Sequence, residues 1–242
     1  MRKLFFSFFI CTFSLNSFSS EFFDNAKEDA LSPFSTDAVK IFGVGSVLTL
    51  LTLSFNDTFK KDFQESVTQE RPLKKYSKWG DFLGNGVPNM AYALFMGGSY
   101  LIYDDQKSLD RVVLMTKASL YSGAMTDLMK ITFRQTRPNG SKYSFPSGHT
   151  TTAFAFSSVV AMEHSLPWGI AANALAAFVG FSRINDNAHY LHDVLAGATI
   201  GAMYGVGVYR VQEIRQQKKA QTATFMLIPL QDGLAANTSL SF

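Results

Sequence analysis

The sequence has little that could cross-link, divide or strongly charge the chain. Its only cysteine is Cys11, so the chain can form no intramolecular disulfide. No stretch rich in glycine, proline and serine interrupts the 242 residues, which predicts one domain with one sizeable core. Charged residues make up only 17% of the chain, and the net charge is +3. Basic residues exceed acidic ones by only three, so we expect no nucleic-acid partner.

The first twenty residues have the features of an export signal. Arg2 and Lys3 precede an apolar run from Leu4 to Leu15, and Ser17-Phe18-Ser19 follows as a small-x-small cleavage motif. We expect residues 1–19 to be a signal peptide, whose removal would lower the net charge to about +1. The alternative is an uncleaved first membrane helix, which the shortness of the run and the polar residues after it disfavour.

Apolar residues, by contrast, make up 47% of the chain and recur near helical spacing in six segments. Such a composition fits a buried helical bundle or a membrane protein. We predict an all-α fold, an antiparallel bundle of about six core helices, in a domain over residues 38–210. The predicted helices are Asp37–Phe55, Asn89–Tyr103, Leu109–Phe133, His149–Glu163, Trp168–Phe181 and Tyr190–Arg210.

Other segments flank or interrupt these helices. Residues 20–37 are mixed and polar and predict an N-terminal arm, while residues 56–86 alternate basic and acidic side chains, which predicts a solvated connector. The alternative interpretation of the connector is an entrance that guides anionic substrates. Residues 211–242 form a C-terminal tail whose second half has two short β-like runs, compatible with a hairpin. Glycines four residues apart in the last predicted helix indicate close helix contacts, in water or in a membrane.

Three clusters between Lys130 and Asp193 hold nearly all of the plausible chemistry. In the third cluster, His189 and Asp193 are four residues apart. On a helix the carboxylate can then bond one imidazole nitrogen and leave the other as a nucleophile toward phosphorus. Arg183, six residues before His189, can bind phosphate oxygens in a bidentate way. Alone, the His-Asp pair is weak evidence, because a surface or capping pair has the same spacing.

The other two clusters add an anion site and two cations. Pro146-Ser147-Gly148-His149 directly precedes a predicted helix, so backbone N–H groups can point at an anion and His149 can act as a general acid. Ser147 can donate its hydroxyl to phosphate or be an ordinary N-cap. Lys130 and Arg137 add positive charge, although a lysine at a helix end and an Arg-Pro loop are also common where there is no site.

Together these residues resemble the tripartite signature of the type 2 phosphatidic acid phosphatase family. That superfamily also includes bacterial class A acid phosphatases and vanadium-dependent haloperoxidases. Every position of the signature is matched in order, and the six-helix pattern extends the likeness to residues 38–210. The matching positions are Lys130, Arg137-Pro138, Pro146-Ser147-Gly148-His149, Ser182-Arg183, His189 and Asp193.

The resemblance implies a role for each matching residue. His189 would attack phosphorus and form a phosphohistidine, Asp193 would orient it, and His149 would protonate the leaving group. Members of this type need no metal, so no cofactor is expected. The implied phosphate-binding residues are Lys130, Arg137, Ser147, Gly148 and Arg183.

Two other interpretations use the same residues. One is a metal site whose ligands would be His149, His189, His192 and Asp193. The lysine and two arginines of the clusters would repel a divalent cation there. The other is a non-catalytic exported or outer-membrane-associated structural protein with a degenerate site, although no position of the signature is degenerate.

The substrate and the location stay open. The resembled family includes six-helix membrane proteins that act on lipid phosphates and soluble exported acid phosphatases. Apolar runs mostly under twenty residues, interrupted by Lys40, Lys117 and Asp127, favour a periplasmic, peripherally attached enzyme. The Asp193–Gly197 segment instead resembles the lipid-acting branch. The expected substrate is a lipid phosphate or polyprenyl diphosphate, or alternatively a small soluble monoester, with the active site on the periplasmic side.

Overall fold

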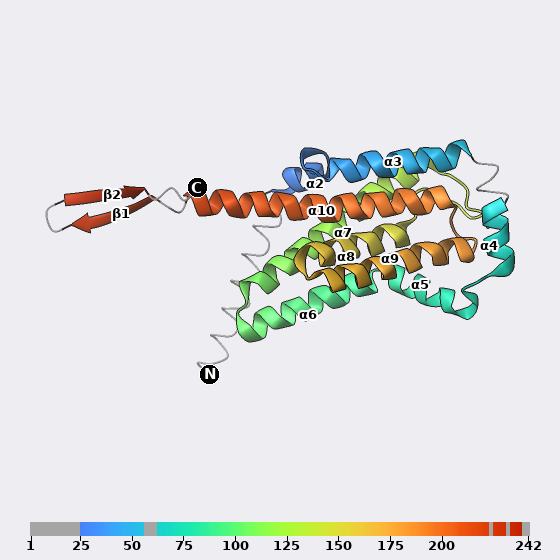
Figure 1. Ribbon diagram of the computed structural model, residues 1–242, viewed down its shortest axis with the longest axis horizontal. Coiled ribbons are helices and arrows are strands. Elements are labelled where there is room, and N and C mark those ends of the chain that lie inside the picture. Colours follow the sequence, from blue (N-terminus) through green and yellow to red (C-terminus); the bar gives the residue numbers. More distant parts are fainter. Residues whose placement is uncertain (1–24, 56–61, 223–224, 231–232, 239–242) are drawn as a thin grey trace.

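Six long helices form the body of the protein in its computed structural model (Figure 1), which describes residues 25–55, 62–222, 225–230 and 233–238. Successive long helices run in opposite directions, so the predicted all-α antiparallel bundle is confirmed. The predicted signal peptide, residues 1–19, lies outside the described residues. The six helices are α3 (Val39–Ser54), α6 (Val87–Tyr103), α7 (Gln106–Phe133), α8 (Gly148–Glu163), α9 (Leu166–Asn185) and α10 (Leu191–Thr222).

The fifth core helix, α9, is longer than predicted at both ends. It begins at Leu166 and includes Pro167, which directly precedes the predicted start at Trp168. Proline is tolerated in the first turn of a helix because its missing N–H needs no partner there. At its other end α9 continues to Asn185, which places Arg183 in the last turn.

A buried ion pair ties the N-terminal arm to the bundle. The short helix α2 (Ala26–Ser35) places the fully buried Asp29 at 2.8 Å from Lys117 of α7 and 2.8 Å from Arg215 of α10. The predicted helix end at Arg210 is wrong, because α10 continues beyond it to Thr222 and this pairing gives the added turns a partner. Beyond α10, two antiparallel strands follow, β1 (Phe225–Leu230) and β2 (Gly233–Thr238).

The connector between α3 and α6 is less solvated than predicted. It contains α4 (Glu65–Glu70), the 3-10 helix η2 (Lys74–Tyr76) and α5 (Ser77–Gly84). The described charged side chains here are exposed, as expected, but Gly80 and Gly84 of α5 are buried. A Cβ at Gly80 would come within 2.0 Å of Ser182 Oγ, and one at Gly84 within 2.6 Å of His149 Cβ. Because these two positions have no side chains, α5 docks directly on α9 and α8.

The helices α8 and α10 are in direct backbone contact at the centre of the bundle. A Cβ at Gly197 would lie 2.5 Å from the carbonyl oxygen of Ser147, and one at Gly201 would lie 2.2 Å from that of Thr151. The close helix contact predicted from the glycine spacing is therefore confirmed. It brings the beginning of α10 against the beginning of α8.

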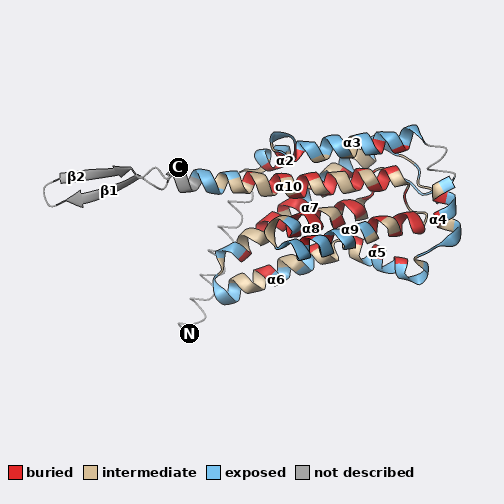
Figure 2. Ribbon diagram, viewed as in Figure 1, coloured by how far each residue is buried: buried red, intermediate tan, exposed pale blue. Residues whose placement is uncertain are grey.

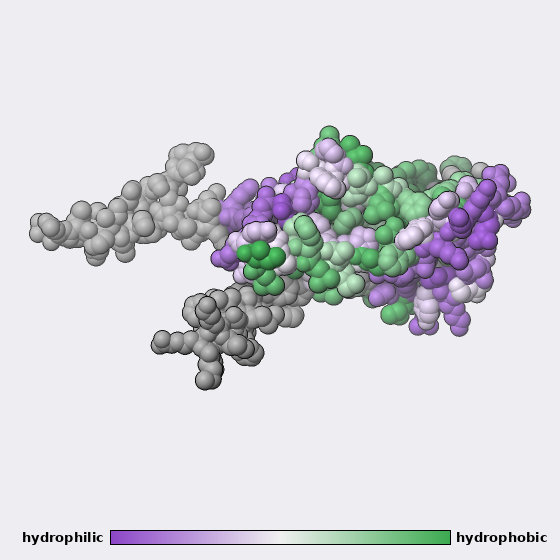
Figure 3. Space-filling model, turned by 90° about the horizontal axis from the view of Figure 1, so that it is seen from below, coloured by the Kyte–Doolittle hydropathy of each residue, from purple (hydrophilic) through white to green (hydrophobic). Residues whose placement is uncertain are grey.

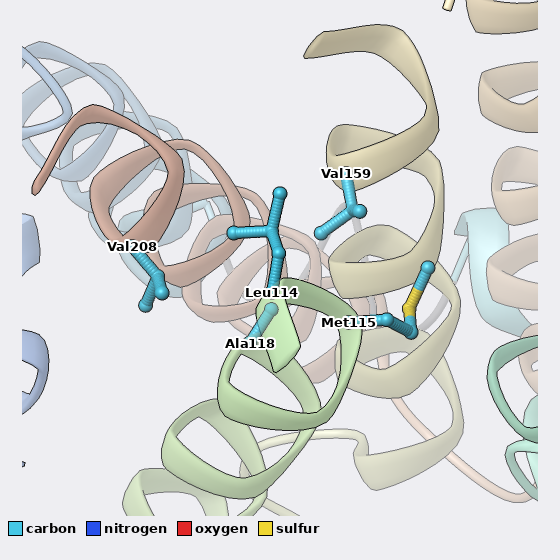
Figure 4. Packing of buried hydrophobic residues seen from close by; sticks show 5 residues of the cluster. All are labelled: Leu114, Met115, Ala118, Val159 and Val208. Carbon is cyan, nitrogen blue, oxygen red and sulfur yellow. The ribbon is translucent and has the colours of Figure 1, made fainter. Parts of the chain in front are cut away.

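A small apolar core joins α7, α8 and α10. Leu114, Met115 and Ala118 of α7 pack with Val159 of α8 and Val208 of α10 (Figure 4), and each is at most 1% exposed. Fully burying an aliphatic side chain of this size stabilises the fold by about 1.5–3 kcal/mol. Buried residues concentrate on these inner helices, whereas α3 and α6 have largely exposed outer faces (Figure 2). The packing thus fixes the helix ends that carry the three clusters.

Candidate active site

The three clusters meet at one end of the bundle, the end that also carries α4 and α5 (Figure 1). α7 and α9 end there, and α8 and α10 begin there. A cavity of about 380 Å³ lies at this end. Asp193 lies behind His189, outside the cavity lining, and Ser147 and Arg183 are also outside it. The predicted site residues that line the cavity are Lys130, Arg137, Gly148, His149 and His189.

His189 lies in the short segment between α9 and α10, two residues before α10 begins at Leu191, although its spacing from Asp193 was argued for a helix. Its backbone N–H donates to the carbonyl oxygen of Arg183 at 3.2 Å, so the end of α9 sets its position. The side chain is buried, and its Nδ1 lies 3.4 Å from Asp193 Oδ2, an ion-pair distance without hydrogen-bond geometry. Nε2 is then the ring nitrogen left to face the cavity.

The Asp193 carboxylate is fully buried among polar groups. Its Oδ2 accepts hydrogen bonds from Ser144 Oγ at 2.5 Å and from the backbone N–H of Tyr190 at 3.0 Å, and its Oδ1 lies 3.1 Å from His192 Nε2. Burial raises the pKa of Asp193, but the contacts with His189, His192 and Ser144 outweigh it and hold that pKa below its ordinary value. Asp193 is therefore a fixed anion.

Lys130 and Arg137 bring positive charge to the cavity. Lys130 Nζ donates to the carbonyl oxygens of Tyr143 at 2.9 Å and Pro146 at 2.6 Å, so it also holds the loop before α8. Burial, and then the charge of Arg137, lower the pKa of Lys130 to about 8. Arg137 Nε is buried without a hydrogen-bond partner among the described residues. This guanidinium therefore has a donor to offer a phosphate oxygen.

The Pro-Ser-Gly-His turn leads into α8 as predicted. Ser147 is the N-cap residue, but its side chain makes no capping hydrogen bond, and its Oγ accepts one from Thr150 Oγ1 at 2.9 Å. Its backbone N–H donates to the carbonyl oxygen of Asp193 at 3.0 Å, which ties α8 to α10. Gly148, the first residue of α8, lines the cavity. The positive end of the helix dipole therefore borders the cavity, where it favours an anion.

Arg183 is paired with α5, a contact that the sequence pattern does not predict. Its Nη1 lies 2.5 Å from Asp81 Oδ1, and its Nη2 lies 3.3 Å from Asp186 Oδ2. The same oxygen of Asp81 lies 3.2 Å from His149 Nε2. The Arg183 side chain is 5% exposed, whereas that of Asp81 is 56% exposed. One carboxylate oxygen thus contacts both a predicted phosphate-binding residue and the predicted general acid.

Burial and nearby cations lower the pKa values of both cavity histidines. The pKa of His149 falls to about 4, first through burial and then through the charge of Arg183, while Asp81 opposes the shift. Burial also lowers the pKa of His189, and the contact with Asp193 opposes it. A neutral His189 has the free lone pair that attack requires. His149 must gain a proton to act as an acid, and a bound phosphate dianion would raise its pKa.

The four residues weighed as metal ligands do not form a metal site within the described ranges. There, no group of three or more histidine, cysteine, aspartate or glutamate side chains is arranged to hold a metal ion. His189 and His192 lie against different oxygens of the Asp193 carboxylate. Lys130 and Arg137 at the cavity would repel a divalent cation.

Comparison with known proteins agrees with the motif. The sequence profile of the PAP2 superfamily matches residues 111–217, the segment that holds all three clusters. Residues 111–217 belong to the PAP2 superfamily. The PAP2 segment runs from α7 into α10 and so includes most of the cavity lining, whereas α3, α5 and α6 lie outside it, although Gly84 at the end of α5 also lines the cavity.

Curated proteins similar to this PAP2 chain match it over part of its length. A lipid A 1-phosphatase from Porphyromonas gingivalis is 38% identical over 96 residues, which cover 38% of this chain and 22% of that protein. A lipid A 1-phosphatase from Rhizobium johnstonii is 30% identical over 103 residues, which cover 36% of this chain and 42% of that protein. The matches thus span less than half the length of these relatives.

Two solved structures share the PAP2 fold of this chain. LpxE from Aquifex aeolicus superposes with a TM-score of 0.54 at 22% identity, covering 62% of this chain and 93% of that one. The first transmembrane PAP2 type phosphatidylglycerolphosphate phosphatase from Bacillus subtilis superposes with a TM-score of 0.57 at 20% identity, covering 73% and 96%. At these identities the likeness shows the fold.

Proposed function

We propose that this chain is a phosphatase that hydrolyses a phosphate monoester or diphosphate through a phosphohistidine on His189. One observation carries the proposal: His189, backed by Asp193, shares a cavity with His149, Lys130 and Arg137. Phosphoryl transfer depends mainly on a positioned nucleophile, a proton donor and fixed positive charge. These residues supply all three.

In the first step His189 Nε2 attacks phosphorus, and the bond to the leaving oxygen breaks as His149 gives that oxygen its proton. Lys130 and Arg137 bind the non-bridging oxygens, and Asp193 stabilises the positive charge on the phosphohistidine. In the second step neutral His149 takes a proton from water, whose oxygen attacks phosphorus and breaks the P–N bond. Inorganic phosphate leaves and His189 is free again. The further predicted phosphate contacts are Ser147, Gly148 and Arg183.

We propose a lipid phosphate as the substrate. The matched relatives are lipid A 1-phosphatases, and one structural neighbour is a phosphatidylglycerolphosphate phosphatase. An apolar groove of about 630 Å³, lined by residues of α2, α3, α7 and α10, runs up to His192, which contacts Asp193. Burying an acyl chain in such a groove is favourable, whereas a small soluble monoester would not use it. At that end of the groove Gln135 lies 3.0 Å from His192, and the ring of Phe145 contacts both His192 and Phe133.

We further propose that the protein is membrane-associated, with its active end on the periplasmic side. Figure 3 shows an apolar band between two polar ends. Leu94 and Phe95 of α6, and Leu166 and Trp168 of α9, are at least 66% exposed. By length and composition α10 could cross a membrane, as could the bent pair of α2 and α3 together. An exposed apolar surface of this extent favours contact with lipid over the soluble periplasmic alternative.

Membrane association predicts the result of cell fractionation. Because the apolar faces would be in lipid, alkaline carbonate, which strips proteins held by charge alone, should leave the chain in the membrane pellet. Release of most of the chain into the supernatant would contradict the proposal. An integral and a soluble marker protein, followed in the same wash, serve as controls.

A substrate panel tests the phosphatase proposal. For the purified protein, kcat/KM should be at least about tenfold higher for lipid phosphates and polyprenyl diphosphates than for small monoesters, because only a lipid chain can bind in the apolar groove. Activity should stay within about twofold in excess chelator, because fixed cations replace a metal. Loss of activity with chelator and recovery with zinc would revive the metal site. A preference for small monoesters would favour the acid phosphatase alternative, and no release from any substrate would defeat the enzyme assignment.

A further inference from the structure

Asp81 lies outside the segment that matches the PAP2 profile, yet it touches two site residues. Its Oδ1 is 2.5 Å from Arg183 Nη1 and 3.2 Å from His149 Nε2, the latter an ion-pair distance without hydrogen-bond geometry. We propose that Asp81 is a positioning residue for phosphoryl transfer, which orients His149 and Arg183 and favours the protonated form of His149. The proposal rests on the proposed phosphatase function.

The position of Asp81 follows from how α5 is docked. Gly80 and Gly84 flank it and have no room for a side chain against Ser182 and His149, so the helix cannot slide or lift without losing these contacts. The chain before α5 is fixed as well, because the backbone N–H of Leu73 donates to a side-chain oxygen of α9 at 3.1 Å. A carboxylate on this helix is therefore held over His149 although it is itself more than half exposed.

The contact assigns the two ring nitrogens of His149. With Nε2 toward Asp81, Nδ1 is left for the substrate, just as Asp193 takes Nδ1 of His189 and leaves Nε2. In the acid step Nδ1 gives its proton to the leaving oxygen, while Nε2–H stays with Asp81. In the hydrolytic step Nδ1 takes a proton from water, and the carboxylate stabilises the imidazolium that forms. Each histidine would then have its own carboxylate.

The charges around His149 give the expected direction of a pH effect. Burial lowers its pKa most, followed by Arg183 of α9, with smaller contributions from Arg137 of the loop before α8 and from His189 before α10 when that ring is protonated, and Asp81 of α5 raises it. Lys130 and Asp127 of α7 line the same cavity. A general acid must be protonated, so kcat/KM falls as pH rises through its pKa. Removing Asp81 lowers that pKa, and the fall should begin at a lower pH.

The test compares Asp81→Asn with two matched variants. Asp81→Asn should lower kcat about ten- to a hundredfold and move the alkaline limb of the pH profile down by about one unit, with KM changed less than about threefold. Asp81→Glu keeps the negative charge, so the alkaline limb of its pH profile should lie at the wild-type pH. Asp186→Asn removes the other carboxylate on Arg183, at Nη2, and should leave the limb in place. A limb that stays in place in Asp81→Asn, or that moves equally in Asp186→Asn, would overturn the proposal.

A second readout does not depend on turnover. NMR titration of ¹⁵N-labelled histidine should show a lower pKa for His149 in Asp81→Asn than in the wild-type chain, and an unchanged pKa would also overturn the proposal. A wild-type chain that releases no phosphate from any substrate would defeat the proposed function itself. An active wild type with an unaffected Asp81→Asn would defeat only the role of Asp81.

Discussion

Replacing His189 with alanine should lower phosphate release by at least about 10³-fold, because no other group at the cavity would supply the nucleophile. The side chain is buried, so folding must be checked by circular dichroism and a melting curve. The measurement is kcat/KM on the best substrate of the panel. Phosphate binding should change far less, since Lys130 and Arg137 remain.

The matched control for this variant is His164→Gln. His164 lies at the other end of α8, where its Nε2 pairs with Tyr92 Oη at 2.8 Å, and glutamine can keep that hydrogen bond. Its activity should stay within about twofold of wild type, since surface substitutions away from a site have small effects. Unchanged phosphate release in a folded His189→Ala protein would support the non-catalytic alternative.

Replacing Asp193 with asparagine should lower kcat about 10²- to 10⁴-fold while His189 stays in place. An amide carries no negative charge, so it cannot stabilise the positive charge on the phosphohistidine. The Asp193 carboxylate can only accept a hydrogen bond donated by His189 Nδ1, whereas the NH₂ group of asparagine could face that nitrogen as a donor. The hydrogen bonds from Ser144 and Tyr190 leave little room for the side chain to turn away. The effect should fall mainly on kcat, because the phosphate-binding cations are untouched.

Asp104→Asn is the control for the loss of one carboxylate. Asp104 is exposed at the end of α6 and has a left-handed backbone, which asparagine also adopts readily. It should keep wild-type kinetics. If Asp193→Asn retained more than about a third of wild-type kcat while remaining folded, Asp193 would not be the partner of the nucleophile.

The sequence is sufficient to predict the six-helix bundle and the end at which its site lies. Apolar periodicity marks helices, and each cluster lies at a predicted helix end, so an antiparallel arrangement must bring them together. The spacing of His189 and Asp193 correctly predicts their contact. It does so although His189 lies just before α10, because its backbone is held by the end of α9.

The roles of Asp81 and Ser144 could not be predicted in this way. The contact of Asp81 with Arg183 joins residues 102 positions apart and depends on α5 docking through two glycines. In sequence, Asp81 lies in the charged stretch of residues 56–86, whose mixed signs indicate a solvated surface. The one available signal was Gly80 and Gly84, spaced four apart on one helix face. Ser144 has no periodic or charge signal, and only the fold places it beside Asp193.

The location was also underdetermined by sequence. Periodicity assigns an inner and an outer face only where the outer face is polar, and helices such as α6 are apolar on both. The short apolar runs favoured peripheral attachment, whereas α6 and α9 carry strongly exposed apolar side chains, and the surface shows an apolar band between two polar ends (Figure 3). Burial, not hydropathy, separates the two interpretations.

The most direct test of a phosphohistidine on His189 is to trap it. Wild-type protein, mixed with a ³²P-labelled lipid phosphate and quenched in alkali after milliseconds, should retain label that is stable to base and lost in acid. Peptide mapping should place the label on His189, and His189→Ala should retain none. Label on another residue, or a burst of product with no labelled protein, would contradict the account.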